Sequence, residues 1–191
     1  LACMDNGSCT YCAVYGCTNP TASNYDPLAT CNDGSCTNTS SNCGGLVSIP
    51  DSNFGQFLEN NGMGDGDSTN NLVLKSNICQ KTGLSLINKP LISDLTGLDY
   101  FISLQNFYLT YTTVTTLDMN SCSPGYGVIQ HNNQLTSVNM GDDFYEVNIS
   151  FNTALTSLDV SANTGLIDFY CSNNNLSTLD IGNNIDLSNL T

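Results

Sequence analysis

The stretch from Asn152 to Asn184, NTALTSLDVSANTGLIDFYCSNNNLSTLDIGNN, decides the fold of this 191-residue chain. One pattern, apolar-x-x-apolar-x-apolar, occurs in it three times, as Leu155/Leu158/Val160, Leu166/Phe169/Cys171 and Leu176/Leu179/Ile181. The last two apolar residues of each triplet are two positions apart, which is the spacing of side chains on one face of a β-strand. The pattern therefore predicts short strands that each bury one face.

Five further triplets precede this stretch: Leu104/Phe107/Leu109, Val114/Leu117/Met119, Gly125/Val128/Gln130, Leu135/Val138/Met140 and Phe144/Val147/Ile149. Of the 24 triplet positions, 22 are apolar, although only 40% of the chain is hydrophobic. Successive triplets begin 9 to 11 residues apart. A fixed short period is the sequence signature of a solenoid, in which two triplets form one coil of about 21 residues.

Alternate triplets are expected to stack into two parallel sheets. One sheet runs through Phe107, Val128, Val147 and Phe169, and the other through Leu117, Val138, Leu158 and Leu179. A column of mostly polar residues follows each middle apolar residue by five positions: Thr112, Cys122, Asn133, Asp143, Asn152, Asn163, Asn174 and Asn184. Asn suits a corner there because its amide satisfies backbone groups that a tight turn leaves unpaired.

These repeats resemble leucine-rich repeats of the nested 21-residue kind (IRREKO type), which occur in secreted proteins of marine Bacteroidetes and in some large viruses. LTSLDVSAN at 155–163 and LIDFYCSNN at 166–174 carry the resemblance, and IPDSNF…ISDLTGL is similar to the segment that precedes such repeats. GCTNPTASNYDPLATCNDGSC at 16–36 looks like a short Cys- and Asp-rich repeat akin to calcium-binding thrombospondin type 3 repeats. The resemblance implies an extracellular surface protein for adhesion or ligand binding. Gly125 and Gln130 depart from the repeat pattern.

The predicted fold is mainly β, with three parts. Residues 1–45 form a disulfide-rich module, 46–103 a solenoid cap, and 104–191 a leucine-rich-repeat solenoid of about four coils. Within the cap we expect a short helix near 51–61 that begins at Asp51 or Ser52, and strands at 72–78 and 84–87. Residues 91–104 are predicted to form a short helical or 3₁₀ connection.

Composition restricts both the location and the partners. Seven of the ten cysteines fall in the first 43 residues, which indicates an oxidising, extracellular compartment. Seventeen acidic residues face three basic ones, for a net charge of -14, which argues against nucleic acid and anionic membranes as partners. No apolar run is long enough to span a membrane, and because the chain begins with Leu1 we expect a mature or partial product.

Calcium is the one cofactor that the sequence suggests. The oxygen ligands would come from Asn19, Asn24, Asp26 and Asp33, and a bridge between Cys17 and Cys36 would hold them in one loop. The alternative is a solvated loop in which Asn and Asp only shape turns. For GMGDGDSTNN at 62–71 the turn interpretation is favoured, because the spacing is not that of an EF-hand.

The two faces of the solenoid are predicted to differ. The outward column of the first sheet is Tyr108, Ile129, Asn148 and Tyr170, with Tyr111, Tyr126 and Tyr145 nearby, and exposed aromatic residues on a rigid sheet are typical of ligand contacts. The other column, Asp118, Asn139, Asp159 and Asp180, is interpreted as a solvated acidic face. His131 is expected to be an ordinary surface histidine.

The sequence thus predicts a secreted or cell-surface, non-enzymatic protein that binds a protein or glycan through the solenoid face. The alternative is a structural subunit that self-assembles into an extracellular filament or surface layer. A hydrolase is disfavoured because no nucleophile, base and acid occur at a useful spacing.

Overall fold

The computed structural model describes residues 14–16, 26–29, 31–32, 43–122 and 124–191. The chain divides into two compact units, Leu1–Asn42 and Cys43–Thr191. In the first unit, β1 (Tyr15–Gly16) pairs in parallel with β2 (Cys31–Asn32). The proposed bridge partners Cys17 and Cys36 and the proposed ligands Asn19, Asn24 and Asp33 lie outside the described residues.

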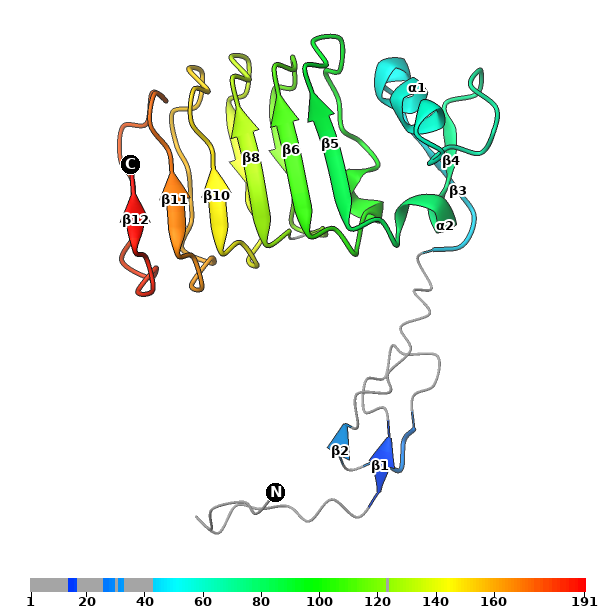
Figure 1. The fold of residues 1–191 in the computed structure, drawn as a ribbon, viewed down its shortest axis with the longest axis horizontal. Helices are drawn as coiled ribbons and strands as arrows, with labels where there is room; N and C mark the ends of the chain where they lie inside the picture. The colour runs from blue at the N-terminus through cyan, green and yellow to red at the C-terminus, as the bar shows by residue number, and fades with distance from the viewer. Residues whose placement is uncertain (1–13, 17–25, 30, 33–42, 123) are drawn as a thin grey trace. The chain divides into compact units, whose positions relative to one another are not determined.

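The second unit is a β-solenoid, as predicted. Its main sheet contains the parallel strands β5 (Gly83–Ile87), β6 (Asn106–Thr110), β8 (Tyr126–Gln130), β10 (Glu146–Asn148), β11 (Asp168–Tyr170) and β12 (Asn189–Leu190). They lie side by side in chain order (Figure 1). Paired positions in neighbouring strands are 20 to 23 residues apart, so each strand begins a new coil. The first strand, β5, lies within the segment that we had assigned to the cap.

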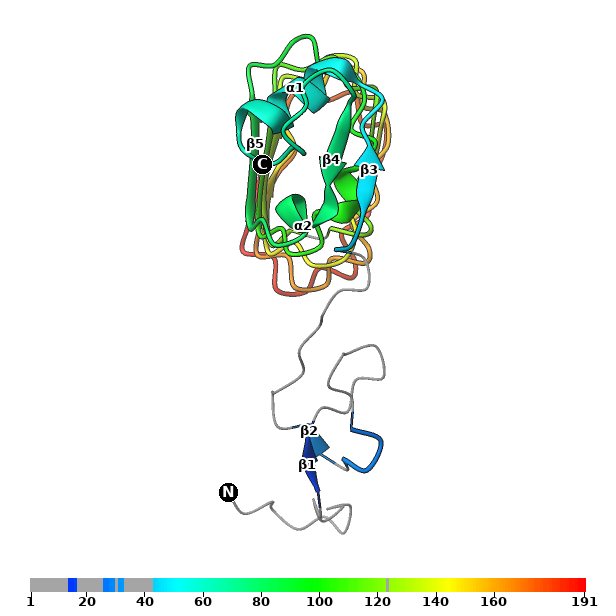
Figure 2. The same ribbon diagram turned by 90° about the vertical axis from the view of Figure 1, so that its right-hand side faces the viewer.

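The opposite side of each coil is less regular. Among the described residues on this side, β7 (Thr116–Asp118) and β9 (Ser137–Asn139) are the strands that form a second parallel sheet, with Leu117 opposite Val138. Leu158 is buried and Leu179 half-buried, but neither lies in a strand. Viewed along the solenoid, each coil is a flattened loop with the main sheet on one long side (Figure 2). The two predicted parallel sheets therefore exist, the second in shortened form.

Strand β8 is shifted by one residue from the prediction. We expected Val128 to point inward, but Gly127 and Ile129 are buried and Ile129 is 0% exposed. A Cβ atom at Gly127 would lie 2.6 Å from Cε1 of Phe144, so the ring of Phe144 occupies the place of a side chain at 127. A larger residue at position 127 would collide with this ring. The inward position of β8 therefore holds a glycine, where the triplet pattern predicts a larger apolar residue.

The same shift corrects the corner column. Asn132, not Asn133, occupies the buried corner. Asp143, predicted from Val138 on the opposite side, is a separate departure, since it is exposed instead of lying in the column. Oδ1 of Asn132 accepts bonds from N and Oγ1 of Thr112 at 3.0 and 2.8 Å, and Oδ1 of Asn152 accepts one from the Asn132 N–H at 3.0 Å. Each coil is thereby hydrogen-bonded to the next by buried amides, as expected of a stacked ladder.

The helix α1 (Ser52–Asn60) covers the first coil (Figures 1 and 2). Asp51 is its N-cap: Oδ1 accepts from the N–H groups of Asn53 and Phe54 at 2.8 and 3.0 Å. The other carboxylate oxygen accepts from N and Oγ of Ser93 at 2.7 and 3.0 Å. Burial raises the pKa of Asp51, but these bonds outweigh it and the net pKa is lowered. The cap residue therefore also ties the helix to the first coil.

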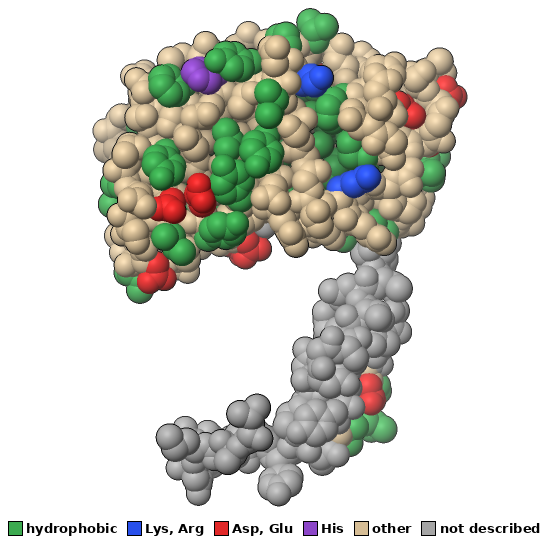
Figure 3. Space-filling view, in the orientation of Figure 1, with side chains coloured by type: hydrophobic (Ala, Val, Ile, Leu, Met, Phe, Trp, Pro, Cys, Tyr) green, Lys and Arg blue, Asp and Glu red, His purple; other side chains and the backbone are tan. Residues whose placement is uncertain are grey.

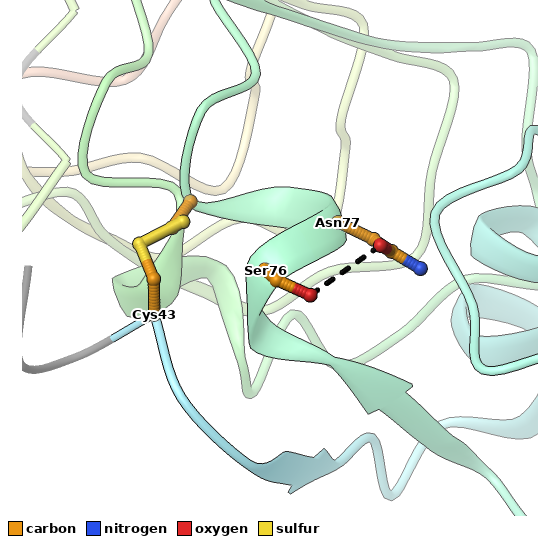
Figure 4. Close-up of a disulfide and its surroundings, with 4 residues drawn as sticks. Cys43, Ser76 and Asn77 are labelled. Atoms are coloured by element: carbon orange, nitrogen blue, oxygen red, sulfur yellow. Dashed lines mark hydrogen bonds between the residues drawn. A yellow bond between two sulfur atoms is a disulfide. The ribbon is translucent and has the colours of Figure 1, made fainter.

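The remainder of the cap corrects one expected strand. β4 (Leu72–Leu74) pairs antiparallel with β3 (Leu46–Ser48), but the chain then turns into a helix, α2 (Lys75–Ile78), where we had expected the strand to continue. The helical turn buries both Ile78 and Cys79. Cys79 is bonded to Cys43, with Cα atoms 5.7 Å apart (Figure 4). The 3₁₀ helix η1 (Leu98–Tyr100) occurs in the predicted connection.

Candidate functional site

The outward face of the main sheet carries three of the four predicted contact residues. Tyr108, Asn148 and Tyr170 are half-buried and point away from the core in register with one another. Ile129 does not belong to this face, because its side chain is fully buried. Val128 pairs with Tyr108 and takes the outward place in β8.

Aromatic side chains gather around Val128. The ring centroids of Tyr108 and Tyr126 are 5.8 Å apart, at an interplanar angle of 52°. The ring of Tyr145 lies over Gly125, where a Cβ atom would be 2.5 Å from Cε1 of that ring. Burial, followed by the neighbouring Tyr108, Glu146 and Tyr145, raises the pKa of Tyr126. We call Tyr108, Tyr126, Val128 and Tyr145 the tyrosine patch; hydrophobic side chains gather at the centre of this face in Figure 3.

A second aromatic feature lies at the corner where the strands end. The ring centroids of Tyr111 and His131 are 4.6 Å apart with an interplanar angle of 4°, and those of His131 and Phe151 are 4.7 Å apart at 15°. Tyr111 is 51% exposed and Phe151 40% exposed. Figure 3 shows the histidine between two hydrophobic side chains at the upper edge of the face. We call these three residues the aromatic ridge.

The backbone of the ridge is strained. Tyr111, His131 and Phe151 have φ angles of 53°, 58° and 62°, in the left-handed region that bulky residues rarely adopt. The same corner position is Asn88 in the coil before and Asn173 in the coil after, with φ of 54° and 57°. Asn tolerates this conformation better than aromatic residues do. Asn is therefore sufficient for the fold at this corner position. The fold does not explain why three successive coils carry an aromatic residue there.

The acidic column on the opposite side has a local structural reason. Oδ1 of Asp118, Asn139, Asp159 and Asp180 accepts a bond from the backbone N–H two residues later, at 3.1, 3.4, 2.9 and 2.9 Å. These are turns closed by a side-chain oxygen. The hydroxyl and N–H of Ser161 lower the pKa of Asp159. The column therefore shapes each corner while keeping this side polar.

The candidate calcium ligands are only partly visible. Asp26 is described, and its Oδ1 accepts from the Leu28 N–H at 2.9 Å, a turn contact. In the 62–71 loop, Asp65 accepts from Asn70 Nδ2 and Asp67 N, both at 2.9 Å, and these two bonds lower its pKa. Within the described part of the chain, no group of three or more His, Cys, Asp or Glu residues is placed to hold a metal. Calcium binding at the N-terminal repeat stays a prediction.

Sequence reasoning missed the ridge because of the shifted third triplet. Tyr111 and Phe151 follow the last apolar residue of their triplets, Leu109 and Ile149, by two positions. His131 follows Ile129 by the same distance, but not Gln130, the residue we had placed at the end of that triplet. With the register of the structure, the three rings fall in one column.

No family model matches the sequence, and no curated protein does either. Among solved structures, an internalin (inlF) from Listeria monocytogenes is 16% identical with a TM-score of 0.47, over 74% of this chain and 49% of that protein. The functional domain of InlJ from the same organism is 18% identical with a TM-score of 0.32, over 78% and 47%. The chain thus spans about half the length of both proteins. No helix among the described residues is long and apolar enough to cross a membrane. An assignment of function therefore rests on the residues of this chain.

Proposed function

We propose that this chain is a non-enzymatic recognition module of a secreted or cell-surface protein, and that it binds a protein partner through the tyrosine patch and the aromatic ridge. The observation that carries the proposal is the ridge: three rings stacked at 4.6 and 4.7 Å on left-handed backbone, with Tyr111 and Phe151 exposed and His131 half-buried between them. Strained residues persist where function requires them and the surrounding structure holds them in place. Here the coils above and below hold the backbone, and the rings add exposed apolar area.

The stacking geometry favours a protein over a sugar at the ridge. The interplanar angles of 4° and 15° mean that the rings turn their faces to one another. His131, between them, therefore has both faces covered and offers solvent only its edge. A sugar stacks on the face of an aromatic ring, whereas ring edges pack well against apolar and aromatic side chains of a protein. Rigid aromatic clusters of this kind commonly form the energetic centre of protein interfaces.

Extracellular location is part of the proposal and has separate support. The Cys43–Cys79 disulfide joins the start of the second unit to the buried residue that follows α2. Stable disulfides form in oxidising compartments. The chain has 17 acidic and three basic residues, which favours a partner with a basic or neutral surface over nucleic acid.

A variant built from the chain's own corner residues tests the proposal. Tyr111→Asn, His131→Asn and Phe151→Asn together copy Asn88 and Asn173, so the corner geometry is kept while the rings are removed. A partner is first selected from a displayed library of extracellular proteins, and its affinity is measured by surface plasmon resonance. Loss of several interface aromatic residues is expected to weaken binding by about a hundredfold or more.

The matched control lies on the opposite side. Asp118→Asn, Asp159→Asn and Asp180→Asn keep the turn-forming oxygen and are expected to leave the affinity unchanged. Equal binding by the ridge variant and the native chain would contradict the proposal. So would a glycan array in which sugars, but no protein, bind in a way that depends on the ridge.

A further inference from the structure

The outer surface of α1 carries a stripe of polar and aromatic side chains. Asn53, Gln56, Phe57 and Asn60 are spaced i, i+3, i+4 and i+7, so they share one side of the helix. This side borders the loop at residues 88–92, which follows β5. A cavity of about 330 Å³ lies between the helix and the loop. That volume is within the range of small-molecule binding sites.

Side-chain amides dominate the walls of this cavity, which we call the amide pocket. Five of its ten lining residues are amides: Asn53, Gln56, Asn60, Asn61 and Asn88. The chain as a whole has 27 Asn and 5 Gln among 191 residues, so the lining is strongly enriched in them. Phe57, half-buried, and Leu91, 71% exposed, add apolar surface.

Hydrogen bonds within the protein position these amides but occupy only some of their hydrogen-bond donors and acceptors. Nδ2 of Asn53 donates to the carbonyl of Leu91 at 3.0 Å, and Nε2 of Gln56 donates to Oδ1 of Asn60 at 3.2 Å. Nδ2 of Asn61 donates to the carbonyl of Phe57 at 2.7 Å. Each amide has two N–H donors and one carbonyl acceptor. The carbonyl oxygens of four of the five amides, all but Asn60, therefore make no bond to the described residues, and neither do the amide nitrogens of Asn60 and Asn88. These groups are open to a ligand.

The charge of the amide pocket narrows the ligand class. Lys89 is the one charged residue among those that line it, and its Nζ lies 5.3 Å from the centroid of the Phe57 ring. None of the described lining residues is acidic, although the chain has 17 acidic residues. A divalent cation needs several carboxylates, and a phosphate group is normally held by several cationic or N–H donors. An apolar ligand would leave the amides unpaired at a cost in affinity.

We infer that the amide pocket binds a neutral saccharide. Each sugar hydroxyl both donates and accepts a hydrogen bond, which matches walls that present amide N–H and carbonyl groups in similar number. The apolar C–H side of a sugar ring packs on Phe57 and Leu91. This site lies in the cap and uses none of the residues of the tyrosine patch or the aromatic ridge, so it is independent of the proposed protein contact.

Saturation-transfer-difference NMR with free glucose, galactose, mannose and N-acetylglucosamine tests the inference. The full chain is expected to transfer saturation to the ring protons of at least one of these sugars, and a titration gives its Kd. The double variant Gln56→Leu and Asn60→Leu is expected to bind about tenfold more weakly or worse, because two hydrogen-bonding groups are removed. Asn175→Leu, an exposed amide in a distant coil, is the matched control and should bind like the native chain.

The double variant is expected to fold like the native chain, and its thermal midpoint checks this. Gln56 and Asn60 are exposed on α1, and Leu has a high helix propensity, so the thermal midpoint should not fall. The triple ridge variant should keep its sugar signal, which separates this inference from the proposed protein contact. Absence of saturation transfer from all four sugars, or an undiminished signal in the double variant, would overturn the inference.

Discussion

The two long sides of each coil are built from the same triplet but treat their outward residues differently. On the side opposite the main sheet, Asp118, Asp159 and Asp180 each close a local turn through a side-chain oxygen. On the main-sheet side, Tyr108 and Tyr126 contact each other, and the ridge that follows the strands lies on strained backbone. Local structure accounts for the acidic residues and does not account for the aromatic ones. Residues that the fold does not need are the ones to examine for binding.

The two corners of a coil differ in the same way, and this gives the largest expected effect. Nδ2 of Asn152, at the corner after the main sheet, donates to the carbonyls of Ile129 and Ile149, both at 2.8 Å. Nδ2 of Asn163, at the opposite corner, has one longer bond, to the Gly141 carbonyl at 3.2 Å, and its Oδ1 has no partner within the described structure. Asn184, also at the opposite corner, donates to the carbonyls of Val160 and Asn163 at 2.9 and 2.7 Å, but its Oδ1 has no partner within the described structure either. The two sides therefore differ most at Asn163, and in the bonds that the amide oxygens accept.

We expect Asn152→Ala to lower the free energy of unfolding by about 3–5 kcal/mol, because several buried backbone groups lose their partners. Asn163→Ala should cost only about 1–2 kcal/mol, since one weak bond is lost. Urea unfolding followed by circular dichroism measures both. Equal losses would show that the two corners contribute alike and would remove the asymmetry between the two sides.

The next prediction concerns the shifted register of β8. Ile129 is fully buried, whereas its neighbour Val128 is half-buried on the outward face. Ile129→Ala should lower the free energy of unfolding by about 2–4 kcal/mol, from lost burial and the cavity left behind. Val128→Ala should cost less than about 1 kcal/mol. The opposite order would restore the register predicted from the triplet pattern.

The period of the repeat predicted the solenoid and its parallel sheets, because the period reflects the coil itself. The register of β8 could not be predicted in the same way. The Gly125/Val128/Gln130 triplet was placed by the residues within it, and these do not show what packs against it from other coils. Gly127 points inward, and Phe144, from the next coil, fills the space of a side chain there. That contact is between residues far apart in sequence. Aligning Asn132 with Asn152 in place of the triplets would have given the observed register, since the corner amides repeat more strictly.

The candidate site was predictable only in part for the same reason. Tyr108, Asn148 and Tyr170 lie in well-formed triplets, so their outward direction followed from alternation along the strand. His131 looked like an isolated surface residue because its column is visible only in the corrected register. The amide pocket is not visible in sequence at all, since the packing of α1 on the 88–92 loop brings its walls together.

Glycine substitutions test the same packing with a smaller effect. Gly127→Ala would place a methyl group against the buried ring of Phe144, 2.6 Å from Cε1, and should lower the free energy of unfolding by about 1–3 kcal/mol. A Cβ atom at Gly165 would have no neighbouring atom within 4 Å. Gly165→Ala should therefore change the free energy of unfolding by less than about 0.5 kcal/mol. Thermal unfolding of both variants makes the comparison. A neutral Gly127→Ala would mean that Phe144 moves freely, which the close packing of the core argues against.

The smallest effect is the most informative about function, because its sign matters more than its size. Phe151→Asn removes a ring stacked on His131, worth about 0.5–1.5 kcal/mol, and relieves left-handed strain of about 1 kcal/mol or more. The free energy of unfolding should stay the same or rise slightly. The reverse change, Asn173→Phe, adds strain with only one ring to stack on and should lower it by about 1 kcal/mol. If Phe151→Asn instead destabilises the chain strongly, the ridge serves the fold, and its exposed rings no longer need a partner to explain them.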